Sequence, residues 1–371
     1  MTFRPRHRFR APGLRAARSS EPPEPGAAPP PFPAARPSAS PGGQKLALYA
    51  GGAIVVLIVI VIIVVSSRPG RKALAYIPKG QHLVQVVDIR RFLHSPLHAA
   101  LAKADHPIIA RLRAREEQFN FDLEKDVALV VDADDLTVLV GRFDPRRLRD
   151  GFEEGVERRE RELSALRKAP VRLAIEHDEV EGRQFLYCDR EGEDTAFASV
   201  GRTLACFGTR WGVRRFLKVK AGIRDPVLDD PDFATVYSRS LARGALLYRL
   251  EKPDGRLLGT VLKDILGDAR QGLRAAFFAV RQEGGSLRVV GRFAAASPAD
   301  AAALRKRLLT PKVAAALARL LGVATGKGMV VSQEGAIVVL DCAVPLSRLD
   351  EIVAADGKGE VRNLVLTMLA G

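Results

Sequence analysis

The segment LTVLVGRFDPRRL, residues 136–148, decides the fold because a similar segment, LRVVGRFAAASPADAAAL, occurs again at residues 287–304. Each copy has the pattern of an apolar strand that ends in VGRF and leads into a helix begun by a proline. The stretches before them also correspond, VALVVDADD at 127–135 and AAFFAVRQEGG at 275–285. We infer a duplicated α+β unit. Each copy is expected to be a mostly antiparallel sheet with helices on one face, in a ferredoxin-like order.

Apolar runs of period two, separated by short turn sequences such as DADD and EGG, predict antiparallel hairpins on both sides of these segments. The expected strands are residues 82–88, 128–131, 136–143, 171–175, 184–188, 196–200, 203–207, 245–250, 275–281, 287–293, 329–332 and 336–342.

Helix starts are predicted wherever Ser, Thr or Asp precedes Pro, because the first residue caps an orphan N–H and the proline has none to leave unpaired. This pair occurs at Ser95-Pro96, Asp144-Pro145, Asp230-Pro231, Ser297-Pro298 and Thr310-Pro311. The longest predicted helix covers residues 145–168 and buries one apolar line. That line is Leu148, Phe152, Val156, Leu163 and Leu166.

A membrane-spanning helix is predicted over the twenty residues from Leu46 to Val65, because no charge interrupts the chain from Leu46 to Ser67. Twenty apolar residues in a helix match the hydrocarbon core of a bilayer, whereas the apolar part of a signal peptide is shorter. The expected organisation is therefore a disordered basic Pro/Ala-rich tail (1–45), a transmembrane helix (46–66), a first α+β half (67–224) and a second (225–371).

The orientation of that helix is predicted from its flanking charges. The tail holds eight Lys and Arg against two acids, which favours a cytoplasmic N-terminus. Close to the helix the balance reverses, since Arg36 and Lys45 precede it while four basic residues follow it, Arg68, Arg71, Lys72 and Lys79. We expect the tail inside the cell membrane and the folded region on the extracytoplasmic side, because large domains translocate largely regardless of charge.

The net charge of +15 belongs to both parts of the chain, because the residues after position 45 still carry +9. Aromatic residues are only 6% of the chain and its arginines are spread out. Nucleic-acid binding, which uses clustered basic residues and interleaved aromatics, is therefore not expected.

The folded region resembles a group of bacterial membrane-anchored or secreted domains of unknown function. The resemblance is carried by YIPKGQHLVQVVDIRRFLHSPLHAAL (76–101), DLEKDVALVV (122–131) and VGRFDPRRL (140–148), and it spans about residues 74–350. It implies an extracytoplasmic α+β domain in the bacterial envelope, and it brings no catalytic residues.

No catalytic, cofactor or metal motif is present in the sequence. Cys188, Cys206 and Cys342 lie in apolar strand-like runs without zinc spacing, where a cysteine behaves as a small hydrophobe. His94 and His98 are four residues apart, but the helix start at Ser95 places His94 before the helix. We therefore expect no cofactor, no metal and no catalytic site.

The segment TRWGVRRFLKVK, residues 209–220, is the most concentrated basic and aromatic stretch of the folded region. Its simpler interpretation is a buried Trp211 at a helix start with exposed cations around it. The alternative is a face for an acidic partner, such as a headgroup or a cell-wall polymer. That face would consist of Arg210, Trp211, Arg214, Arg215, Lys218 and Lys220.

Taken together, these patterns predict a single-pass membrane protein whose folded region is a non-catalytic interaction or structural module with an envelope protein or acidic polymer as partner. The alternative is an extracytoplasmic enzyme, or a carrier of a lipid or other ligand, that uses a cleft between the two halves. A dry apolar cleft would favour the carrier. The sequence does not identify a small-molecule ligand.

Overall fold

The computed structural model describes residues 73–189, 194–323, 328–357 and 363–369. All of them belong to one compact unit, Val64–Gly371. The predicted tail and membrane helix, residues 1–66, lie outside the described residues, so both stay predictions. None of the helices in the described ranges combines the length and apolarity that crossing a membrane requires.

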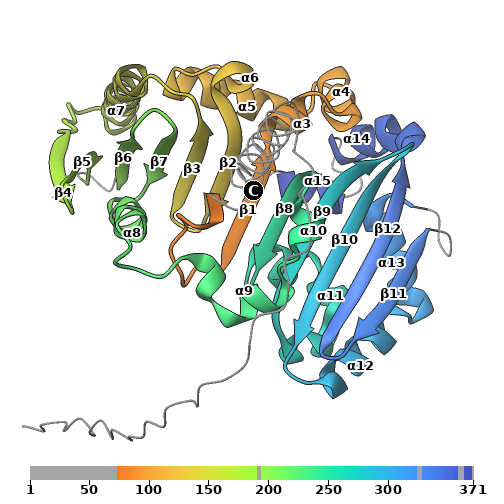
Figure 1. Ribbon diagram of the computed structural model, residues 1–371. Coiled ribbons are helices and arrows are strands. Elements are labelled where there is room, and N and C mark those ends of the chain that lie inside the picture. The colour runs from red at the N-terminus through yellow and green to blue at the C-terminus, as the bar shows by residue number, and fades with distance from the viewer. Residues whose placement is uncertain (1–72, 190–193, 324–327, 358–362, 370–371) are drawn as a thin grey trace, which may run out of the picture. The chain divides into compact units, whose positions relative to one another are not determined.

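The described residues form a mixed α+β fold around one large antiparallel sheet (Figure 1). Its strand order is β11-β12-β10-β9-β8-β1-β2-β3-β7-β6-β5-β4, and every neighbouring pair is antiparallel. The strands are β1 (Leu83–Asp88), β2 (Val127–Ala133), β3 (Leu136–Gly141), β4 (Glu176–Val180), β5 (Arg183–Cys188), β6 (Thr195–Val200), β7 (Leu204–Gly208), β8 (Ala245–Glu251), β9 (Leu273–Glu283), β10 (Ser286–Ala295), β11 (Met329–Glu334) and β12 (Ile337–Pro345).

Helices lie in the connections between these strands and after the last strand, β12. They are α3 (Ile89–Leu93), α4 (Pro96–Lys103), α5 (Pro107–Phe119), α6 (Leu123–Asp126), α7 (Pro145–Arg167), α8 (Arg210–Lys220), α9 (Pro231–Val236), α10 (Arg239–Ala242), α11 (Lys263–Leu266), α12 (Pro298–Leu308), α13 (Pro311–Leu321), α14 (Leu349–Gly357) and α15 (Leu364–Leu369).

The five predicted helix starts are all confirmed, since α4, α7, α9, α12 and α13 each begin at the expected proline. In four of them the preceding side chain accepts a backbone N–H, as Asp144 does from Arg146 at 3.0 Å. Thr310 is the exception, because its side chain makes no such bond.

Both faces of the sheet are apolar, and helices cover both (Figure 1). In the first half, α7 packs Leu148 and Phe152 on one face, while α8 packs Val213 and Phe216 on the other. The prediction of helices on only one face of each half was therefore wrong. The reason is visible in β8, where every residue is buried, because a strand apolar on both sides needs cover on both sides.

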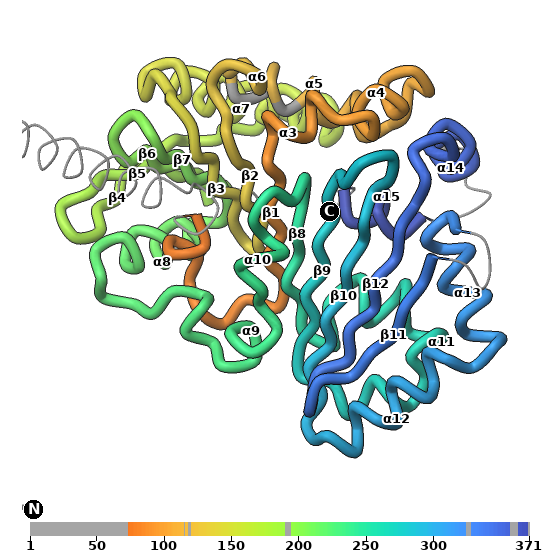
Figure 2. The backbone as a smooth tube through the Cα atoms, turned by 45° about the vertical axis from the view of Figure 1, so that its right-hand side comes forward, coloured from red at the N-terminus to blue at the C-terminus, as the bar shows by residue number. Residues whose placement is uncertain are grey.

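The predicted ferredoxin-like order was also wrong. A ferredoxin-like unit is a split β-α-β, in which a third strand lies between the two strands joined by a helix. Here α3 to α6 connect β1 to β2, and these two strands pair directly, as Figure 2 shows. Because the helical connection returns the chain to the end of the sheet at which it left, β2 lies antiparallel beside β1.

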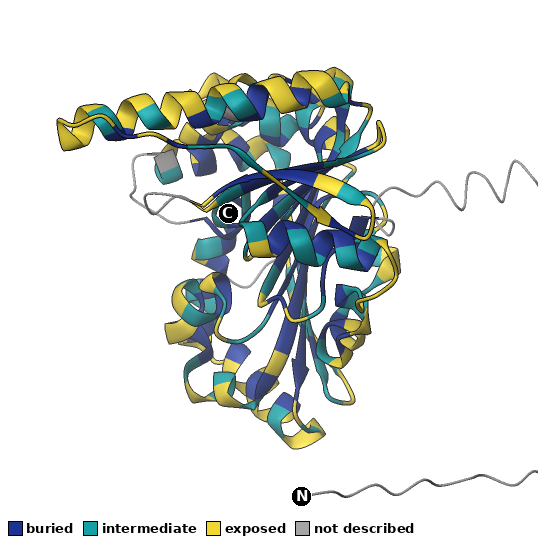
Figure 3. Ribbon diagram, turned by 90° about the vertical axis from the view of Figure 1, so that its left-hand side faces the viewer, coloured by how far each residue is buried: buried dark blue, intermediate teal, exposed yellow. Residues whose placement is uncertain are grey.

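The predicted strand at 171–175 is absent, and the chain there is irregular between α7 and β4. Val171 and Leu173 are nevertheless buried, and their backbone N–H groups bond to α7 side chains instead of to a neighbouring strand. Val171 N–H donates to Ser164 Oγ at 2.9 Å, and Leu173 N–H donates to Glu160 Oε2 at 2.7 Å. Leu166, at the end of the expected apolar line, is 81% exposed. Figure 3 shows the same contrast between buried strands and exposed outer helix surfaces.

Candidate functional site

A cavity of about 850 Å³ lies between strands β1 to β3 and the helices α3, α5 and α7. One end is lined by apolar side chains from both layers. These include Phe92, Ile108, Val130, Leu139 and Phe152. All of its lining residues come from the first half except Leu369, which belongs to the second half. The cleft between the two halves that the sequence suggested for an enzyme or carrier stays a prediction.

The other end of the cavity is polar because the same sheet face carries a row of polar side chains toward the β2–β3 turn. Gln85 on β1 is opposite Asp132 on β2, and Asp132 is opposite Thr137 on β3. All three line the cavity. Thr137 Oγ1 donates to Asp132 Oδ1 at 2.6 Å. The cavity therefore has the two-ended character that suits an amphiphile.

The polar row continues away from the cavity onto β8, where Arg249 is opposite Gln85. Arg249 is 1% exposed, and its Nη1 donates to Gln85 Oε1 at 3.3 Å while its Nε donates to Glu251 Oε2 at 2.9 Å. Burial raises the pKa of the Glu251 carboxyl, and the Arg249 guanidinium offsets part of that rise. Glu251 Oε1 also accepts the Leu257 N–H at 2.6 Å, so the ion pair is fixed in place.

The turn that borders the polar end is fixed by carboxylates. Asp134 accepts the backbone N–H groups of His82 at 2.6 Å and Leu83 at 3.0 Å. Asp135 receives Arg215 Nη2 on both oxygens, at 2.8 and 2.9 Å. Because these bonds join β1, the turn and α8, this end of the cavity is built on a rigid frame.

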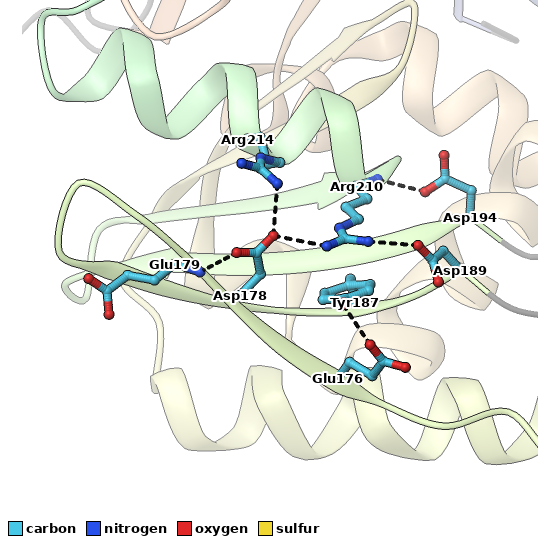
Figure 4. A network of polar contacts seen from close by, with 8 residues as sticks. All are labelled: Glu176, Asp178, Glu179, Tyr187, Asp189, Asp194, Arg210 and Arg214. Carbon is cyan, nitrogen blue, oxygen red and sulfur yellow. Dashed lines mark hydrogen bonds and ion pairs between the residues drawn. The ribbon is translucent and has the colours of Figure 1, made fainter.

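The arginines of the predicted acidic-partner face have partners within the protein, and Figure 4 shows those of Arg210 and Arg214. Arg210 donates to Asp178 at 3.1 Å and to Asp189 at 2.8 Å, and its guanidinium lies 3.7 Å from the centre of the Tyr187 ring. Arg214 also donates to Asp178, at 3.0 Å. With Arg215 bound to the β2–β3 turn, these arginines hold α8 against the sheet.

The remaining members of that face, Trp211, Lys218 and Lys220, differ in their exposure and in their partners. Trp211 is 57% exposed, so the simpler expectation of a buried tryptophan was wrong. It lies about 200° around the helix from the buried Val213, on the side away from the sheet. Lys220 lies 4.4 Å from the centre of the Tyr76 ring. Lys218 has no acidic partner among the residues that the structure describes.

The cysteines and histidines form no metal-binding cluster in the described part of the chain. Cys188, Cys206 and Cys342 are free and buried. Burial raises the pKa of the Cys206 thiol well above its usual value and that of Cys342 to about 11. Within the same ranges no group of three or more His, Cys, Asp or Glu side chains is arranged to hold a metal.

The cavity was missed at the sequence level, although two signals pointed to a buried polar row. Gln85 interrupts the apolar strand LVQVVD, and Arg249 interrupts ALLYRLE. A long polar side chain in an otherwise buried strand needs a buried partner. The sequence does not show that β1 and β8 are neighbours, and this follows only from the order of strands in the sheet.

Comparisons with known proteins find only distant structural similarity among the matches described below. No family model and no curated protein matches the chain. Crystal form III of a protein designated TP0453 has a TM-score of 0.42 at 10% identity, covering 76% of this chain and 97% of that one. Forms IV and I each have a TM-score of 0.39, at 10% and 12% identity, covering 76% of this chain and 96% of that one. At these values the likeness carries no functional argument, and the resemblance found in the sequence stays a prediction.

Proposed function

We propose that the folded region binds an amphiphile, such as a lipid, with its apolar chain in the cavity between the sheet and α7. The observation that carries the proposal is the cavity of about 850 Å³, which is apolar at one end and polar at the other. Ligand sites commonly occupy about 300–1,000 Å³ and combine an apolar lining with a few fixed polar groups. A lipid fits this description, and a purely polar metabolite does not.

The predicted helix at 46–65 would hold such a site beside a bilayer. We propose that the chain is anchored in the cell membrane with its N-terminus cytoplasmic and its folded region extracytoplasmic. The apolar run of that segment and the basic tail before it support this topology. A carrier tethered in this way would exchange ligand with the adjacent membrane.

The test uses Gly155, which lies on α7, lines the cavity and has open space around an added Cβ. Gly155→Phe should fill the cavity without breaking the helix. We expect lipid recovered by solvent extraction from the purified full chain to fall at least about fivefold. Glu157→Phe, on an exposed position of α7, adds the same ring outside the cavity and should leave lipid recovery unchanged. Equal recovery from the two variants would refute the proposal.

A second candidate is the non-catalytic interaction module, and the exposure of Trp211 favours it. Exposed tryptophans are enriched among residues that anchor protein interfaces. Trp211→Ala should then reduce recovery of an envelope protein or acidic polymer with the full chain, while Leu309→Ala, also at an exposed apolar residue, should not. Unchanged recovery from Trp211→Ala would remove this candidate.

We also propose that the two halves are copies of one unit. Counted outward from the β1–β8 pair, one half has the order β1-β2-β3-β7-β6 and the other β8-β9-β10-β12-β11. A helix follows the third strand in both, α7 after β3 and α12 after β10. Another follows the fourth strand, α8 after β7 and α14 after the short turn that ends β12. The shared order supports the proposal together with the repeated VGRF segments.

A further inference from the structure

The lining of the cavity carries charges of both signs, and they come from its two walls. The sheet and its connecting segments supply carboxylates, whereas α7 supplies both arginines and one further carboxylate. These residues are Asp132, Asp134, Asp135 and Asp194 on the sheet side, and Arg158, Arg159 and Glu162 on α7. Arg158 and Asp194 are exposed, so they lie where the cavity meets solvent.

The carboxylates of the sheet side gather at the end of the β2–β3 turn. Two consecutive residues after β7 link them, because Thr209 N–H donates to the carbonyl oxygen of Asp135 at 3.0 Å and Arg210 N–H donates to Asp194 Oδ1 at 2.7 Å. Asp194, which comes directly before β6, is therefore level with the turn that contains Asp134 and Asp135.

Helix α7 carries its arginines to the same end. It starts beyond the end of β3 that is opposite the β2–β3 turn, and its Phe152 stacks on Phe197 in the middle of β6 with the ring centres 5.8 Å apart. Arg158 is six residues further along, which is about 9 Å of helix. It therefore lies toward the end at which Asp194 precedes the strand.

Arg158 and Asp194 each have a charge that a ligand could use. Arg158 pairs with no acid among the residues that the structure describes, whereas its neighbour Arg159 donates to Glu162 at 3.1 Å. Asp194 accepts the backbone N–H of Arg210, and no Lys or Arg side chain in the described ranges pairs with its carboxylate. The opening thus offers an unpaired cation on α7 and an unpaired carboxylate on the sheet side.

We infer that the cavity binds a zwitterionic phospholipid, whose phosphate contacts Arg158 and whose ammonium group contacts Asp194. This rests on the proposed binding of an amphiphile and specifies its headgroup. The planar guanidinium of arginine can donate two parallel N–H bonds to a phosphate, and a carboxylate attracts an ammonium group. The acyl chain would extend from this opening toward Phe152 and Leu139.

A headgroup with a single charge fits this opening less well. An anionic headgroup bound to Arg158 would lie near the unpaired carboxylate of Asp194, and a cationic headgroup bound to Asp194 would lie near Arg158. Like charges repel, and the repulsion is stronger beside a protein wall than in bulk water. A zwitterion places each of its charges beside the opposite charge of the protein.

The experiment uses the full chain in micelles of an uncharged maltoside detergent, which offers no charged competitor. Three phospholipid probes have the same photoactivatable acyl chains. Phosphatidylcholine carries both charges, phosphatidylglycerol carries the phosphate charge alone, and O-ethylphosphatidylcholine carries the ammonium charge alone. At neutral pH and equal mole fraction in the micelle, labelling is measured on peptides from β2, β3 and α7. We expect phosphatidylcholine to label them about fivefold more efficiently than either of the other two.

Two substitutions each remove one charge of the opening. Arg158→Gln should lower labelling by phosphatidylcholine and phosphatidylglycerol, but not labelling by O-ethylphosphatidylcholine. Asp194→Asn keeps an oxygen for the Arg210 N–H and should lower labelling by phosphatidylcholine and O-ethylphosphatidylcholine, but not labelling by phosphatidylglycerol. Labelling by phosphatidylcholine should fall about fivefold in each variant.

The matched controls are Arg161→Gln and Asp150→Asn, which make the same changes of charge at exposed positions of α7 outside the cavity lining. Both should keep the wild-type preference for phosphatidylcholine. Gly155→Phe, the variant that fills the cavity, should lower labelling by all three probes.

The possible failures are distinguishable. If a singly charged probe labels the wild-type chain as well as phosphatidylcholine does, or if Arg158→Gln or Asp194→Asn labels like the wild-type chain, the zwitterion inference is wrong. Loss of labelling in Gly155→Phe would then still support the cavity as the binding site. If Gly155→Phe labels like the wild-type chain with every probe, the proposed amphiphile binding is wrong and the inference falls with it.

Discussion

Glu251 is fully buried on β8, and its two oxygens bind two different groups. One accepts from Arg249, and the other accepts the N–H of Leu257. Glu251→Ala would leave a buried guanidinium without a counter-charge, which costs about 3–5 kcal/mol. We expect the free energy of unfolding in urea to fall by that amount.

The control for this change is Glu334→Ala, at an exposed position on the edge strand β11. Its effect should stay within about 0.5 kcal/mol. Similar losses from the two variants would mean that the Arg249–Glu251 pair does not hold this part of the sheet.

Asp178 gives the fold a dependence on pH. Burial alone would raise the pKa of its carboxyl, but the Glu179 N–H and the guanidinium groups of Arg210 and Arg214 outweigh burial and lower it. The pKa of this carboxyl is lower in the folded state than its unfolded value of 3.8, so the charged carboxylate stabilises the folded state at pH values above 3.8. This stabilisation is lost as the pH falls through the folded pKa. The Tm of Asp178→Asn should therefore lie about 2–4 °C below wild type at pH 7, with the gap closing toward pH 3. A constant gap would show that the carboxylate charge is not responsible.

Among the elements, local chemistry predicted the helix starts and nearly all the strands. Ser or Asp before Pro fixes a helix end through bonds within a few residues, so no tertiary information is needed. The strand at 171–175 failed because its partners, Ser164 and Glu160, are on a neighbouring helix. The strand β4 was missed because EHDEV is a charged edge strand without the expected apolar alternation.

The repeated VGRF segments make a prediction about their two glycines. A Cβ at Gly141 would overlap the carbonyl oxygen of Asp126, whereas one at Gly291 would meet Phe293 and Phe278 side chains at 3.2 and 3.3 Å. A backbone carbonyl cannot move aside to make room for a methyl group, whereas phenylalanine rings can shift by a few tenths of an ångström. Gly141→Ala should therefore lower the free energy of unfolding in urea by about 2–3 kcal/mol or more, and Gly291→Ala by about 1 kcal/mol or less. The reverse order would mean that the two segments pack differently.

At the scale of the molecule, the sequence predicted the α+β class but not the cavity or the partners of its arginines. Arg215 and Asp135 are 80 positions apart, and Gln85 and Arg249 are 164 apart. Such pairs follow from strand order, which depends on which apolar faces cover each other rather than on any local motif. The prediction that helices cover only one face of the sheet failed for the same reason. The same sequence pattern fits a sheet that helices cover on one face or on both.

The predicted orientation can be measured because the natural thiols are buried. Leu166 is 81% exposed, so Leu166→Cys adds one accessible thiol to a chain whose own cysteines are shielded. In intact cells, a membrane-impermeant maleimide should label Leu166→Cys strongly and the wild-type chain hardly at all. Labelling only after lysis would place the folded region in the cytoplasm.

The central position of β1 has a consequence for how the chain is made. One edge of β1 pairs with β2, and the other edge pairs with β8, which is synthesised much later. Gln85 and its partner Arg249 are 164 residues apart, so at ordinary synthesis rates that edge is open for on the order of ten seconds. During this time the nascent first half presents an unpaired apolar strand to its surroundings. Correct folding of the first half thus depends on how fast the ribosome synthesises the second half. Slow codons between β1 and β8 would be a source of misassembly.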